Sequence, residues 1–263
     1  MSEIAMRAGV RDTRRFYFLM AASCLAISVV SFMPTYFVPM ARGTFKAEPL
    51  VHLHGLILFS WMIFFFTQTW LVAQGKVLAH RKWGMLGIVI VTAMTFVGFT
   101  LASLRIAQAE LPGQPAQLAH AVRAFGWAHI SSLALIAALF ALAIVKLRDT
   151  ETHKRLILLL TISMLGPAAA RWFKTFLAPP PPPPLPGFPV INLPPVAFTV
   201  APALVGDVML LVAMMFDWRS NGRVHPVYWA GGGVMLLLQV TVVPVSNSAP
   251  WQAIAHAIGH LAG

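Results

Sequence analysis

The sequence predicts an all-α integral membrane protein built as a seven-transmembrane-helix bundle, and three observations lead to that fold class. Hydrophobic residues make up 58% of the 263 residues and charged residues only 10%, whereas soluble globular chains carry about 25% charged residues. The mean hydropathy is +0.76. The apolar residues fall in seven runs, each close to the ~20 residues that cross a bilayer as a helix.

The seven runs define the expected elements in chain order. They cover residues 16–38, 50–73, 83–107, 120–147, 155–177, 196–217 and 226–245. Residues 1–15 precede them as a short segment, and residues 16–245 form the transmembrane domain. The first run lacks a small-residue cleavage site at its end. It is therefore expected to stay as an anchor rather than to be removed as a signal peptide.

Basic residues predict the orientation of the bundle. Thirteen of the 19 Lys and Arg residues would lie on one side of the membrane: Arg7, Arg11, Arg14, Arg15, Lys76, Arg81, Lys82, Lys146, Arg148, Lys154, Arg155, Arg219 and Arg223. The positive-inside rule then places the N-terminus in the cytoplasm and the C-terminus outside, in a bacterial inner membrane. Because the charges form short clusters between apolar runs, the net charge of +11 indicates topology and excludes nucleic acid as a partner.

Two outer segments flank the last spans. Residues 178–195 hold ten of the 20 prolines and are expected to form an extended, stiff loop. Residues 246–263 are expected to form an amphipathic helix on the outer membrane surface. Its apolar side would consist of Trp251, Ile254, Ala255 and Ile258, and its polar side of Gln252, His256 and His260. His256 and His260 share one helix face, either as a metal-binding pair or simply as part of that polar side.

Polar residues inside the spans are the best functional candidates, because each is costly in hydrocarbon. At 1.5 Å per residue, His54 of the second span and His129 of the fourth lie about 28 Å and 27 Å above the inner helix ends. The two side chains are thus expected at one level in the outer third. By the same count, Arg171 lies about 24 Å above the inner end of its helix, Gln239 about 20 Å and Asp207 about 15 Å. Arg171 and Asp207 are near enough in depth to neutralise each other.

Further histidines extend this set. His52 lies two residues before His54 and points about 200° away from it, so we expect it beside a neighbouring helix, and it remains a candidate metal ligand. A non-haem metal would need a third or fourth ligand. The candidates for that role are Glu48, His52, His120 and Asp207. A second histidine pair, His80 and His153, lies at the cytoplasmic boundary.

Four short motifs carry a family resemblance. They are His-Leu-His-Gly at 52–55, His-Arg-x-x-Gly at 80–84, His-Lys-Arg at 153–155 and Gly-Arg-Val-His-Pro at 222–226. They resemble an uncharacterised family of bacterial multi-spanning membrane proteins. The alternating histidine pairs are also similar to those of di-haem membrane b-type cytochromes.

The second resemblance implies a specific ligand set. His54 and His129 would ligate an outer haem b, and His80 and His153 an inner one. Basic residues such as Arg171 would lie near the propionates, and small residues such as Gly126 would leave space for the macrocycle.

The leading prediction is therefore a histidine-ligated redox protein that passes electrons between a membrane quinol, or a periplasmic donor, and a partner. No catalytic residue is assigned, and a non-haem metal ion or no cofactor at all remain alternatives. A second reading is a non-catalytic accessory subunit of a larger membrane complex, in which the intramembrane polar residues only hold the bundle together. A third is a proton or small-solute pathway through Asp207, Arg171 and Gln239. A retinal protein is excluded because Lys174 is the last lysine, which leaves the final span without a Schiff-base amine.

Overall fold

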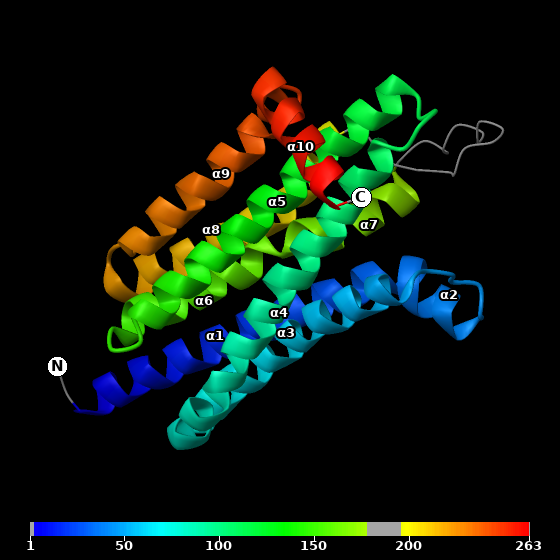
Figure 1. Ribbon diagram of the computed structural model, residues 1–263. Helices are drawn as coiled ribbons and strands as arrows, with labels where there is room; N and C mark the ends of the chain where they lie inside the picture. The colour runs from blue at the N-terminus through cyan, green and yellow to red at the C-terminus, as the bar shows by residue number, and fades with distance from the viewer. Residues whose placement is uncertain (1–2, 178–195, 263) are drawn as a thin grey trace.

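The computed structural model describes residues 3–177 and 196–262, and this part of the chain is helical without a strand (Figure 1). The helices are α1 (Glu3–Phe32), the π-helix η1 (Met33–Phe37), α2 (Val38–Ala41), α3 (Pro49–Ala73), α4 (Val77–Ala109), α5 (Ala116–Val145), α6 (Thr150–Ser163), α7 (Leu165–Phe176), the 3-10 helix η2 (Val196–Thr199), α8 (Val200–Asn221), α9 (Pro226–Ser246) and α10 (Ala249–Ala262). The proline-rich loop predicted at 178–195 lies outside the described residues.

Seven helical segments are long and apolar enough to cross a membrane, which confirms the predicted fold class. They are Arg11–Ala41, Pro49–Ala73, Val77–Ala109, Ala116–Val145, Thr150–Phe176, Val196–Asn221 and Pro226–Ser246. The first, third, fourth and fifth spans begin four to six residues earlier than the apolar runs predicted. His80 and His153 are each the fourth residue of their helix, so they lie in the first turn of the third and fifth spans.

Proline accounts for the irregular stretches in the first and fifth spans. Pro34 lies at the start of the π-helix that joins α1 to α2, and Pro167 follows the turn at Met164 that separates α6 from α7. A proline has no backbone N–H, and its ring clashes with the carbonyl four residues earlier, so a regular helix cannot continue through it. The π-helix turns Thr35 and Tyr36 towards other helices, as described below.

The helices pack in an order that leaves two facing pairs across the interior. α3 packs against α1 and α4, α5 packs against α4, α6 and α9, and α7 packs against α1 and α8. Among the described helices, neither α3 with α5 nor α4 with α6 is one of the extensively packed pairs. These two facing pairs carry the histidines predicted to act together.

The two ends of the bundle are called the N-side and the C-side (Figure 1). The N-side holds the start of α1 and the turns at 74–76, 146–149 and 222–225, and the C-side holds α10. Helix α10 forms as expected, but the side predicted to face the membrane packs largely on α4 and α5. Trp251 and Ala255 are buried there, whereas Ile254 is 53% exposed. The reason is the indole N–H of Trp251, which donates to the Arg123 carbonyl oxygen at 2.8 Å and fixes the helix on α5.

Candidate functional site

The C-side half of the bundle brings together two histidines from facing helices. His54 on α3 and His129 on α5 lie close enough to interact electrostatically, as their equal predicted depth suggested. The His129 Nδ1 atom lies 3.2 Å from the carbonyl oxygen of Phe125. A carbonyl only accepts, so Nδ1 carries the proton and Nε2 keeps a free lone pair. The His54 ring has no hydrogen-bond partner among the described residues.

The surroundings of this pair are open. The His129 side chain is exposed and the His54 side chain is partly buried. A Cβ atom placed on Gly55, next to His54, would meet nothing within 4 Å. Gly126 does not contribute to this space, contrary to expectation. A Cβ there would lie 2.7 Å from the Ile106 Cδ1 atom, so Gly126 serves the contact between α4 and α5.

Arg171 of α7 is the third group at this level. Its charge is within electrostatic reach of His54, its Nη1 atom donates to the Thr35 hydroxyl at 3.3 Å, and its guanidinium lies 4.0 Å from the centre of the Phe32 ring. The ion pair considered between Arg171 and Asp207 is not formed. Asp207 instead accepts a hydrogen bond from the Gln239 amide at 2.9 Å. Within the described part of the chain, Arg171 is a cation without a carboxylate partner.

His52 is held apart from this group. Its Nδ1 atom and the Tyr36 hydroxyl are 3.0 Å apart, and its ring meets the Phe45 ring edge to face at a centroid distance of 5.6 Å. The structure therefore places His52 against the π-helix and the following loop, as its helical angle predicted. It does not bring His52 together with His129.

The second histidine pair lies in the N-side half. His80 on α4 and His153 on α6 also interact electrostatically. The Nδ1 atom of His153 donates to the Ala143 carbonyl oxygen at 2.9 Å, which again leaves Nε2 free. The Nδ1 atom of His80 and the Oε1 atom of Gln68 are buried without a hydrogen-bond partner. Buried polar atoms are rarely left unpaired in native proteins, so these two atoms mark this level as a candidate site.

Trp61 separates the two histidine pairs, and the sequence did not single it out. Its side chain is 1% exposed, its indole N–H donates to the Thr161 hydroxyl at 3.2 Å, and its ring meets Phe140 edge to face. It lies seven residues from His54 and seven from Gln68 along α3, about 10 Å of helix in each direction. His54 and Gln68, which contacts His80, are thus about 21 Å apart along α3. Trp61 lies halfway between them.

A buried ion pair at the N-side was also missed. Arg155 donates two hydrogen bonds to Asp217, from Nε at 2.8 Å and from Nη2 at 2.6 Å, and the Asp217 side chain is 1% exposed. Arg155 also pairs with Glu151, and the backbone N–H of His225 donates to Asp217 at 3.2 Å. Burial, together with the nearby Arg155 charge, lowers the pKa of His225. Asp217 at the end of the sixth apolar run was the one sign of this ion pair in the sequence. It was missed because Arg155 was used only to predict the orientation of the bundle.

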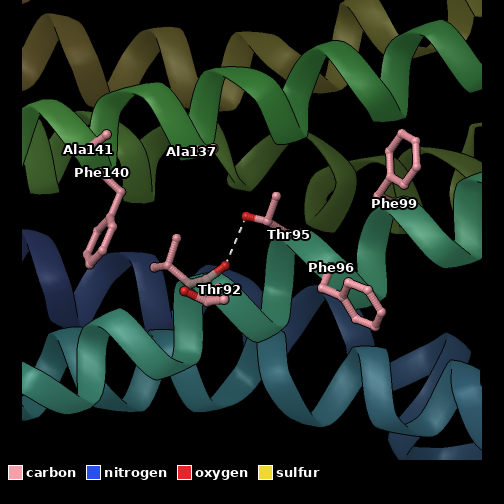
Figure 2. A pocket seen from close by; sticks show the side chains of 8 residues that line it. Thr92, Thr95, Phe96, Phe99, Ala137, Phe140 and Ala141 are labelled. Atoms are coloured by element: carbon pink, nitrogen blue, oxygen red, sulfur yellow. Dashed lines mark hydrogen bonds between the residues drawn. The ribbon is translucent and has the colours of Figure 1, made fainter.

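A cavity of about 490 Å³ lies between α4 and α5, away from both histidine pairs. Figure 2 shows its lining residues, which are Val91, Thr92, Thr95, Phe96, Phe99, Ala137, Phe140 and Ala141. The Thr95 hydroxyl donates to the Val91 carbonyl oxygen within the same helix at 2.9 Å. The lining carries no charged or metal-ligating side chain, so this cavity offers no group for catalysis.

No family model, no curated protein and no solved structure matches this chain. A functional assignment therefore depends on the chemistry of the site itself.

Proposed function

We propose that this protein is an electron-transfer protein of the bacterial inner membrane, and that His54 and His129 would hold a haem b between α3 and α5. The observation that supports this most strongly is that His54 and His129, on two helices that are not extensively packed on each other, lie within electrostatic reach of one another. His129 directs its N–H to a backbone carbonyl, the arrangement in which a metal-bound histidine is normally held.

The surroundings fit the group chemically. A haem site needs two neutral imidazoles and positive charge near the propionates. Arg171, a cation without a carboxylate partner among the described residues, lies within electrostatic reach of His54. Its role in the proposal is to hold a propionate by charge and hydrogen bonding.

His80 and His153 would hold a second haem by the same reasoning. His153 shows the same N–H to carbonyl contact, and the buried Nδ1 atom of His80 has no hydrogen-bond partner among the described residues. A bound haem supplies one-electron chemistry. The chain supplies the ligands, the charge of Arg171, and the buried Trp61 that keeps water out of the region between the two levels. Two redox levels in one bundle suit transfer across the membrane, from a quinol or a donor outside it.

The test is an absorption spectrum of the full chain purified in detergent from cells supplied with iron and a haem precursor. We expect a Soret band that His54→Ala and His129→Ala each abolish or halve. His52→Ala is the matched control, because it removes an imidazole from the same helix that faces Tyr36 instead, and it should keep the band. His80→Ala should remove the part of the haem content that the second site holds.

Two results would overturn the proposal. One is a colourless wild-type protein with no bound iron by elemental analysis. The other is a haem spectrum that neither His54→Ala nor His129→Ala changes.

A further inference from the structure

A second cluster of metal-ligating side chains lies at the C-side, outside the membrane-spanning helices. Glu110 at the end of α4 and the two histidines His256 and His260 on α10 each offer a ligand atom, and these atoms lie within 4.8 Å of one another. The sequence suggested the two histidines as a possible metal pair, but the carboxylate is 146 residues away in the chain and only the fold brings it to them.

We propose that His256 and His260 bind a divalent transition-metal ion through their Nε2 atoms, and that the Glu110 carboxylate orients His256 for this role. The two Nε2 atoms are 3.2 Å apart. Two nitrogen ligands of a tetrahedral zinc ion, each at about 2.0–2.1 Å from the metal, are separated by about 3.3–3.4 Å. The pair is therefore already spaced for coordination.

Glu110 sets the tautomer of His256. Its Oε2 atom lies 2.6 Å from the His256 Nδ1 atom, and an ionised carboxylate only accepts, so Nδ1 carries the proton and Nε2 presents its lone pair. A carboxylate on the far nitrogen of a metal-bound histidine raises its basicity as a ligand and fixes its ring.

The cluster is held rigidly at its base. The Arg123 Nη1 atom donates to the other oxygen of Glu110 at 2.8 Å, and its Nε atom donates to the Gln252 side chain on α10 at 2.9 Å. Gly259 allows the carboxylate to lie beside α10, because a Cβ there would be 2.7 Å from the Glu110 Cγ atom. Arg123 therefore ties the orienting carboxylate to both α5 and α10.

The metal-facing side is open to solvent. The His256 side chain is 56% exposed, and His260 is exposed as well, so an ion can reach both nitrogens and keep water at its remaining positions. Imidazole ligands suit Zn²⁺, Cu²⁺ and Ni²⁺. In the metal-free chain the two nitrogens share a proton in a hydrogen bond, and this proton must leave the His260 Nε2 atom when the ion binds.

The experiment is a Zn²⁺ titration of the full chain in detergent, after chelator treatment, in competition with a zinc indicator dye. His260→Ala is the main variant, because it removes one ligand and leaves the contacts among His256, Glu110 and Arg123 intact. We expect it to bind one zinc ion fewer than the wild type. Glu110→Gln should keep the stoichiometry but bind about 10- to 100-fold more weakly, the usual effect of losing such a partner.

His120→Ala is the matched control. His120 lies on α5 close to Arg123, but its side chain takes no part in the cluster, so the variant should bind zinc like the wild type. Equal stoichiometry and affinity in the wild type and in His260→Ala, including no binding in either, would overturn the proposal. The haem proposal stands or fails separately, because His260→Ala leaves the imidazoles at His54 and His129 in place.

Discussion

The buried pair formed by Arg155 and Asp217 leads to the sharpest prediction about stability. Asp217→Asn keeps the size of the side chain but removes its charge, so the Arg155 guanidinium loses its buried counter-ion. The Arg155 side chain is only 4% exposed and that of Asp217 1%. The variant thus leaves a buried charge whose remaining carboxylate partner among the described residues is the exposed Glu151.

The magnitude follows from the remaining partners. Breaking a buried ion pair by removing one member costs about 3–5 kcal/mol. Arg155 keeps its contact with Glu151, whose side chain is 58% exposed, so the lower end applies, about 3 kcal/mol. At roughly 2–4 °C per kcal/mol for a chain of this size, the melting temperature should fall by about 6–12 °C.

The assay is thermal unfolding of the detergent-solubilised protein followed by tryptophan fluorescence. Asp207→Asn is the matched control. It also neutralises an intramembrane acid, but its partner is the Gln239 amide, so the loss should stay within about 1 kcal/mol. The double variant Arg155→Met with Asp217→Leu should recover most of the stability, because neither charge is then buried alone. A melting temperature of Asp217→Asn equal to that of Asp207→Asn would refute this reasoning.

Three further predictions concern the other polar contacts. Trp61→Phe should lower the free energy of unfolding by about 1 kcal/mol, because it removes the hydrogen bond to Thr161. Trp61→Ala should lower it by about 3–5 kcal/mol, because it also leaves a cavity between the histidine pairs. Chemical denaturation measures both losses, and equal losses would contradict this role of the Trp61 ring. Because its pKa in the folded state lies below the ordinary value of 4.5, Glu110 contributes stability that is fully present above pH 4.5 and is lost as the pH falls through the folded-state pKa. Melting curves between pH 3 and 7 should show a smaller loss in Glu110→Gln than in the wild type, because Asp149 and Glu151, whose pKa values are also lowered, remain in the variant. If haem is bound as proposed, Arg171→Gln should lower its reduction potential, because removing a nearby positive charge favours the oxidised form; a redox titration in which the potential is unchanged or rises would argue against Arg171 lying beside the haem.

Much of the candidate site was predictable because it follows from position along a helix. His54 and His129 were placed at one level by counting residues from the helix ends, and the structure brings them together. His52 was expected to point elsewhere, and it contacts Tyr36. Both predictions depend only on helical geometry, which is the same in every helix of this kind.

Contacts between helices were predicted less well. The sequence paired Arg171 with Asp207 by depth, but the two side chains bond Thr35 and Gln239 instead. Depth is one coordinate, whereas contact also requires that two helices be neighbours and be rotated towards each other. Trp61 was missed for a related reason, since an apolar aromatic residue in a span has no polar signal before its partner on α6 is known.

The sequence by itself determined the membrane fold and the seven spans, because these depend on local composition and on the length of each helix. Only the tertiary structure decided which polar groups meet. Asp217 joins Arg155 across 62 residues and His256 joins Glu110 across 146. The physical reason is that hydrocarbon excludes an unpaired polar group but does not specify its partner. The packing and rotation of whole helices select that partner.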